Sequence, residues 1–195
     1  MHAAGSEFMP VMAVHRKLTV EQYHRMGETG ILPQDDRVEL IEGELIEMSP
    51  IGHFHAGLGN LLVDLFAHRI RGQAIVCVQN PIRLDIHSEL QPDFALLRYR
   101  ADHYKQAIPT AADVLLLIEI ADSSLRYDRE IKRPLYARRA IPEYWLIAIP
   151  DRCIEVSRDP DAQRGVYRNT RTVSEGRLAP ASFPEVTLDV REFLS

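Results

Sequence analysis

Four short apolar runs constrain the fold of this chain more than any other feature of its sequence. Each run is five to seven residues long and is rich in the aliphatic and β-branched side chains that fill central strands. The runs span residues 74–78, 92–97, 114–120 and 144–149. We therefore expect these four segments to be the buried strands of the domain.

Two helical patterns are found before the apolar runs. Apolar residues recur at spacings of three and four over residues 54–70, which predicts an amphipathic helix that stops at Gly72. Thr19 is the expected N-cap of a shorter helix that ends near Gly27 or Gly30. These two helices precede all four apolar runs.

A hairpin and a third helix complete the expected elements. Residues 37–48 have the pattern of two strands around a turn at residues 42–43, where glycine supplies a positive φ. A helix is expected from after Asp128 to Ala140, with Pro134 as a discordant residue that lacks a backbone donor. The residues after the last apolar run predict two or three more strands and a loose end. This order of elements is typical of a mixed α/β core.

Two neighbouring strands carry a carboxylate at one end. Asp93 follows Pro92 at the start of one strand, and Glu119 lies near the end of the next. An ionised carboxylate in an apolar strand is costly unless a cation meets it, and a divalent metal ion is the first candidate. The alternatives are a turn or cap role for Asp93 and a structural ion pair for Glu119.

Charge is distributed unevenly along the chain. The formal net charge is -5, which argues against a protein that coats nucleic acid by charge alone. Residues 35–47 carry six acids against one base, whereas residues 126–139 carry six bases against two acids. The basic segment is the expected contact for a nucleic-acid backbone.

Cysteine usage and hydropathy predict a cytoplasmic protein. Cys77 and Cys153 lie in apolar segments without a Cys or His at ligand spacing, so we expect reduced thiols without a catalytic role. No apolar run approaches the roughly 20 residues that cross a bilayer, and no secretory signal precedes the first helix. Residues 1–8 end in the translation of two common cloning sites and are interpreted as an expression scar, which leaves residues 9–195 as a single domain.

Several short motifs follow one another in a distinctive order. They are ELIEGELIEMSP (residues 39–50), QPDF (91–94), IEIADSS (118–124), YDREIK (127–132), LY (135–136) and IPEYWL (141–146). In this order they resemble the Uma2 (DUF820) family of endonucleases within the PD-(D/E)XK superfamily, over roughly residues 37–156. The resemblance implies a restriction-endonuclease-like fold, in which a central mixed sheet flanked by helices presents a metal site at strand ends.

The resemblance also implies the ligands of that site. Asp93 and Glu119 would bind Mg²⁺, with Mn²⁺ as a substitute. The superfamily pattern asks for a lysine two residues beyond the glutamate, where this chain has Ala121. Lys132 is the best substitute for that lysine, because Asp128, Lys132 and Tyr136 share one face if the helix is continuous.

Other residues receive secondary roles. Glu44 on the acidic hairpin is a candidate third metal ligand, although its acidic neighbours are of similar type. Gln79, Tyr136 and Arg129 are candidate contacts to substrate or water. A zinc site at His53 and His55 is not expected, because residues two apart on a helix point to different faces, and both are assigned surface or core roles.

These expectations lead to one main hypothesis and two alternatives. The main hypothesis is a Mg²⁺-dependent endonuclease that acts on DNA as a homodimer, the dimer being an analogy with the superfamily. The first alternative is a catalytically silent nucleic-acid-binding or assembly module, suggested by Ala121 and by the acidic net charge. The second is a metal-dependent hydrolase of another phosphorylated substrate.

Overall fold

A six-stranded mixed sheet forms the centre of the computed structural model, which describes residues 16–33 and 35–194. The strand order is β10-β9-β8-β7-β6-β3; β7 and β8 are parallel, and the other neighbours are antiparallel. The strands are β3 (Ala74–Cys77), β6 (Phe94–Arg98), β7 (Val114–Ala121), β8 (Glu143–Ala148), β9 (Cys153–Asp161) and β10 (Val166–Val173). All four apolar runs are strands of this sheet, which confirms the predicted mixed core. The expression scar assigned to residues 1–8 lies outside the described residues.

A second sheet contains the predicted hairpin and one that was not predicted. Its order is β2-β1-β5-β4, with β1 (Val38–Ile41), β2 (Glu44–Glu47), β4 (Ile82–Asp85) and β5 (Ser88–Leu90). The turn between β1 and β2 places Glu42 at φ 50° and Gly43 at φ 84°, as a type I′ hairpin requires. Strands β4 and β5 were missed because three or four residues are too few to show a hydrophobic period.

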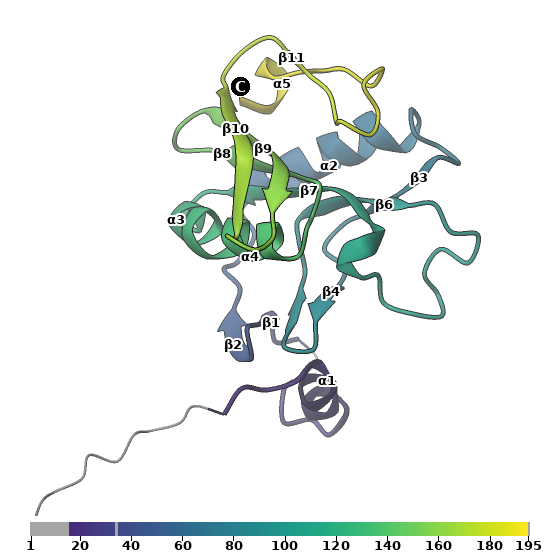
Figure 1. Cartoon of the computed structure of the whole chain (residues 1–195), viewed down its shortest axis with the longest axis vertical. Helices are drawn as coiled ribbons and strands as arrows, with labels where there is room; N and C mark the ends of the chain where they lie inside the picture. Colours follow the sequence, from purple (N-terminus) through teal and green to yellow (C-terminus); the bar gives the residue numbers. More distant parts are fainter. Residues whose placement is uncertain (1–15, 34, 195) are drawn as a thin grey trace, which may run out of the picture.

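The structure also contains helices, of which α2 (His53–Ala67) and α4 (Arg133–Arg138) pack on the two faces of the central sheet. The others are α1 (Val20–Glu28), α3 (Leu125–Tyr127), the π-helical turn η2 (Asp128–Lys132) and α5 (Arg191–Leu194), with the 3-10 turn η1 (Ala111–Asp113) before β7. Thr19 caps α1 in a capping box with Gln22, as predicted. Figure 1 shows α1 and the β1–β2 hairpin at the bottom of the molecule and the C-terminal segment with α5 at the top.

The third predicted helix is present, but its start and its regularity differ from the prediction. It begins at Leu125 rather than after Asp128 and continues through η2 into α4. Pro134 lies in the first turn of α4, where a missing N–H costs little, and the preceding π-turn bonds the Arg133 amide to the Asp128 carbonyl. The proline therefore does not break the helix.

The two faces of the central sheet bury separate apolar cores. On one face, α2 packs through Leu58, Leu62 and Phe66, together with residues of the C-terminal segment. On the other face, α4 and the second sheet pack on Leu117 and Ala121 of β7. Because side chains alternate along a strand, Glu119 lies on the same face as Ala121, toward α4. The C-terminal segment is packed rather than loose, since its apolar side chains are buried in the first core.

Two expectations about the chain as a whole can be compared with this fold. Cys77 and Cys153 are buried free thiols, as expected from their apolar surroundings. Among the described residues, no helix has both the length and the apolar character that spanning a membrane requires.

Candidate metal centre

The start of β6 and the end of β7 bring two carboxylates together. In this antiparallel pair Phe94 lies opposite Ile118, so Asp93 and Glu119 meet just beyond the last paired residues. Oδ2 of Asp93 accepts a 2.8 Å hydrogen bond from the Ile120 amide, and the Asp93 amide donates a 3.4 Å bond to Oε2 of Glu119. The two side chains that the sequence singled out are therefore neighbours in space.

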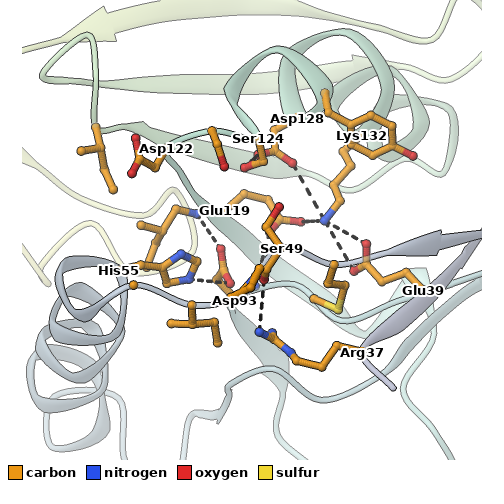
Figure 2. Close-up of a pocket in the computed structure, with 18 of the residues that line it drawn as sticks. Arg37, Glu39, Ser49, His55, Asp93, Glu119, Asp122, Ser124, Asp128 and Lys132 are labelled. Carbon is orange, nitrogen blue, oxygen red and sulfur yellow. Dashed lines mark hydrogen bonds and ion pairs between the residues drawn. The ribbon is translucent and has the colours of Figure 1, made fainter. Parts of the chain in front are cut away.

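These carboxylates lie in a cavity of about 480 Å³ between the second sheet, the N-terminus of α2 and the helix after β7. Asp93 is 8% exposed and Glu119 is 3% exposed, so both are largely withdrawn from water. Figure 2 shows that Glu39 enters from β1, His55 from α2, and Asp128 and Lys132 from the helix. Segments that are remote in sequence thus contribute side chains to one cavity.

Lys132 reaches the carboxylates from the helix, as the sequence predicted for a continuous helical face. Its Nζ lies 3.2 Å from Oε1 of Glu119 and 3.1 Å from Oε2 of Glu39. Burial alone lowers the pKa of Lys132, but Glu119, Glu39 and Asp128 outweigh it and raise the pKa above its usual value. The side chain is therefore an ammonium ion at any physiological pH.

Glu119 lies at the centre of this arrangement. Its Oε1 also accepts a 2.6 Å hydrogen bond from the Tyr136 hydroxyl. Burial raises the pKa of Glu119 well above its usual value; Lys132 opposes this shift, and the carboxylates of Asp93, Asp128 and Glu39 add to it. The single ammonium of Lys132 thus does not offset the burial of Glu119 and the surrounding negative charge, and a bound cation would relieve this imbalance.

His55 is a site residue that the sequence analysis missed. Its Nε2 lies 2.8 Å from Oδ1 of Asp93, and both side chains line the cavity. The expectation of a surface or core role for His55 is therefore corrected. His53 is exposed at the mouth of the same cavity. Nothing in the local pattern distinguished them, because the contact depends on where the first turn of α2 lies relative to β6.

Of the hairpin acids Glu39 and Glu44, Glu39 lines the cavity and Glu44 does not. Glu39 is buried. Its Oε1 accepts a 2.7 Å hydrogen bond from the backbone N–H of Gln91, in addition to its contact with Lys132. Glu44 is exposed on β2 and lies outside the cavity lining. The structure therefore does not bring Glu44 to Asp93 and Glu119.

The three candidate substrate contacts also lie outside the cavity lining. Tyr136 is fully buried, and its hydroxyl donates a hydrogen bond to Glu119 from within the core, so it contacts a cavity residue without lining the cavity. The backbone N–H of Gln79 donates a hydrogen bond to the backbone carbonyl of Pro92, which is next to Asp93. Arg129 forms ion pairs with Asp151 and Glu155.

All six bases of the segment 126–139 have acidic partners. The pairs are Arg126 with Glu130, Arg129 with Asp151 and Glu155, Lys132 with Glu39 and Glu119, Arg133 with Glu155, Arg138 with Glu42, and Arg139 with Asp85. The expected basic surface is therefore largely neutralised by the protein itself. This charge neutralisation was not readable from the sequence, because most of the acids come from distant segments.

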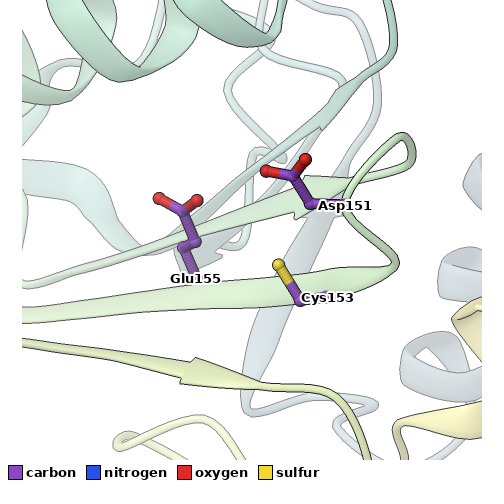
Figure 3. Close-up of side chains that lie close together, drawn as sticks. All are labelled: Asp151, Cys153 and Glu155. Carbon is purple, nitrogen blue, oxygen red and sulfur yellow. The ribbon is translucent and has the colours of Figure 1, made fainter.

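A second group of potential ligands lies on β9 and the turn before it. Asp151, Cys153 and Glu155 offer ligand atoms within 4.8 Å of one another. Figure 3 shows these three side chains close together. However, Arg129 pairs with both carboxylates, and Arg133 adds a 2.9 Å contact to Glu155. Burial and the adjacent carboxylates raise the pKa of Cys153, which disfavours the thiolate that binds metals. The guanidinium groups already supply the positive charge here.

The cavity differs from this cluster because its acids exceed its bases. Its lining residues include six carboxylates and two cationic side chains, which are Glu39, Glu47, Asp93, Glu119, Asp122 and Asp128 against Arg37 and Lys132. Oxygen donors with surplus negative charge are the donor set that suits Mg²⁺ or Mn²⁺. Asp93 and Glu119 are the two that lie at adjacent strand ends.

Comparisons with known proteins agree with this fold. The family model of Uma2, described as "Putative restriction endonuclease", matches residues 20–191. None of the curated proteins matches the chain. Among solved structures, the chain is similar to a putative nuclease belonging to DUF820 from Anabaena variabilis ATCC 29413, with 15% identity and a TM-score of 0.72. The similarity covers 90% of this chain and 97% of that one, which shows a shared nuclease-like fold.

Proposed function

The chain belongs to the Uma2 family, and from that premise we propose that it is a Mg²⁺-dependent endonuclease that hydrolyses DNA phosphodiester bonds. The observation that carries the proposal is the pairing of Asp93 and Glu119 in a cavity with six carboxylates against two cationic side chains. A phosphodiester carries negative charge and would be repelled from such a cavity without a metal ion. Acidic lining therefore favours metal-dependent chemistry over a simple anion-binding site.

Each side chain has a role in this mechanism. A bound Mg²⁺ ion would neutralise phosphate charge and activate water. Asp93 and Glu119 would hold it, with His55 orienting Asp93 and Tyr136 orienting Glu119. Lys132 supplies the positive charge that the absent lysine at Ala121 would otherwise provide, and it does so from a helix instead of a strand.

The proposal extends to partners and location. DNA is the substrate class that the family description favours, and Mn²⁺ is expected to replace Mg²⁺ because both prefer oxygen ligands. A homodimer in the cytoplasm is part of the proposal. The edge strand β10 supports the dimer, since its eight residues leave one side of the central sheet for pairing.

A plasmid-nicking assay tests the proposed activity. Wild type is expected to nick supercoiled DNA with Mg²⁺ or Mn²⁺ and to lose this activity with excess chelator. Asp93→Asn and Glu119→Gln should each reduce the rate at least about 100-fold, because they remove ligand charge at nearly unchanged shape. Asp64→Asn, on the exposed face of α2, is the matched control and should retain the rate. Cleavage that persists in Asp93→Asn would contradict the proposal.

One observation favours a second candidate, a metal-dependent hydrolase of a smaller phosphorylated substrate. The six bases of residues 126–139 are paired with acids, so this helix offers little free charge to a long DNA backbone. Competition between short duplexes and nucleotides separates the two candidates. Nucleotides that inhibit nicking at lower concentrations than duplexes do would favour the smaller substrate.

A further inference from the structure

The ammonium group of Lys132 lies inside a cage of three buried carboxylates. Its Nζ is 3.1 Å from Glu39, 3.2 Å from Glu119 and 3.9 Å from Asp128. The side chain of Lys132 is 9% exposed, and those of the three acids are 2–4% exposed. Among the described residues, no other Lys, Arg or His nitrogen lies within 4.0 Å of these carboxylates. One cation thus serves three acids.

Glu119 divides its two oxygens between this cage and the Asp93 side of the cavity. Oε1 faces Lys132 and Tyr136, whereas Oε2 faces the Asp93 amide. In Figure 2 the ammonium lies on one side of Glu119 and Asp93 on the other. A carboxylate shared in this way resembles the bridging acid between two cation positions, which lie about 3.5–4 Å apart in two-metal sites.

The cage is held by contacts that do not involve a metal ion. Ser124 donates a 2.7 Å hydrogen bond to Oδ2 of Asp128, and the Gln91 amide donates to Glu39. The π-turn η2 contains both Asp128 and Lys132, and α4 continues from it into the core. The position of the ammonium is therefore determined by the fold, and each of the three acids has a further hydrogen-bond donor.

We propose that Lys132 is a built-in second cation. The ammonium occupies the position that a second divalent ion takes in two-metal nucleases, so the site binds a single divalent ion on the Asp93 side of Glu119. This inference rests on the proposed function, because it assumes a metal ion at Asp93 and Glu119. It follows that removing the ammonium leaves three buried carboxylates without a cation, and an uncompensated cage of this kind attracts a divalent ion.

Counting bound Mn²⁺ tests the inference without measuring activity. The full chain is titrated with Mn²⁺, and binding is monitored by calorimetry and by the electron paramagnetic resonance signal of free Mn²⁺. We expect one bound ion per chain for wild type and none for Asp93→Asn. Lys132→Met removes the charge at similar length and should bind two ions. Lys105→Met, at an exposed lysine outside the cavity, is the control and should bind one. Adding Glu39→Gln and Asp128→Asn to Lys132→Met should return the count to one.

The possible outcomes separate this inference from the proposed function. No Mn²⁺ bound to wild type would overturn the metal site and the inference together. Two ions bound to wild type would overturn the inference alone and leave the nuclease proposal standing, and this outcome does not depend on whether any variant folds. One ion bound both to wild type and to folded Lys132→Met would also overturn it. If Lys132→Met folds only when Mn²⁺ is present, the count in the refolded protein decides.

Discussion

The phenolic oxygen of Tyr136 lies 2.6 Å from Oε1 of Glu119, the oxygen that also faces Lys132. Burial raises the pKa of Tyr136 well above its usual value, and the negative charge of Glu119 adds to the shift. The hydroxyl therefore remains a donor at any physiological pH. Tyr136 connects the apolar core to the candidate metal centre and limits the positions that the Glu119 carboxylate can adopt.

Removing this hydroxyl should weaken the fold as well as the site. Tyr136→Phe keeps the ring packing but leaves a buried carboxylate without one donor, so we expect the free energy of unfolding to fall by about 1.5–3 kcal/mol. Urea denaturation measures this change. Tyr144→Phe is a matched control, because its fully buried hydroxyl has no hydrogen-bond partner among the residues that the structure describes, and its ring lies 5.2 Å from that of Tyr136. Equal losses in the two variants would show that the bond to Glu119 is not the cause.

His55 should affect the site more than the fold. Its 2.8 Å contact with Asp93 orients a proposed metal ligand, and loss of such a partner typically reduces metal affinity or activity about 10–100-fold. We expect this reduction for His55→Ala in Mn²⁺ titrations and in plasmid nicking. His68→Ala, at the exposed C-cap of α2, should change neither. If His55→Ala binds Mn²⁺ with the wild-type affinity, His55 does not orient the metal ligand Asp93 and has only a packing role.

The hairpin acids Glu39 and Glu44 should behave differently. Glu39→Gln removes one partner of the buried Lys132 ammonium, so we expect a loss of stability of about 2 kcal/mol and slower nicking. Glu44→Gln alters an exposed strand residue and should change stability by less than about 0.5 kcal/mol. Thermal unfolding and nicking rates of the two variants decide which acid belongs to the site. A larger effect of Glu44→Gln would restore the original sequence-based choice.

Arg129 should contribute little to nucleic-acid affinity. Its guanidinium pairs with Asp151 and Glu155 and lies outside the cavity lining. A side chain that contacts phosphate lowers the slope of log affinity against log salt by about one when it is removed. We expect Arg129→Ala to leave this slope unchanged for a short duplex in fluorescence anisotropy. A salt slope whose magnitude falls by about one in Arg129→Ala would instead show that Arg129 contacts a phosphate.

Tyr104 should make stability sensitive to alkaline pH. Burial and the nearby Asp113 raise the pKa of Tyr104 to about 12 from the model-peptide value of 10.0. Between these values the native state holds a proton that the unfolded chain has lost, so the free energy of unfolding decreases as pH rises. Urea denaturation from about pH 9 to 11 should show this decrease, and Tyr104→Phe should reduce its slope. Identical slopes in the two proteins would contradict the assignment.

Local patterns were sufficient for most elements of the fold. The capping box at Thr19 and the turn at Gly43 depend only on residues close in sequence. The apolar runs are long enough to identify central strands. Asp93 and Glu119 could be paired because each lies at an end of such a strand. The assignment of Lys132 also needed the family resemblance, which asks for a lysine near the glutamate; helical spacing with Tyr136 then made Lys132 the best substitute.

Only the tertiary structure decided which other side chains join them. Glu39 and Lys132 are separated by 93 residues, and the choice of Glu39 over Glu44 depends on which side of the hairpin packs against β5. The contact of His55 with Asp93 depends on how α2 crosses the sheet. Likewise, the bases of residues 126–139 look free in the sequence because most of their acidic partners lie on remote strands and turns. The sequence by itself determined the elements and the two central carboxylates, since these depend on local conformation; their surroundings depend on packing between distant segments.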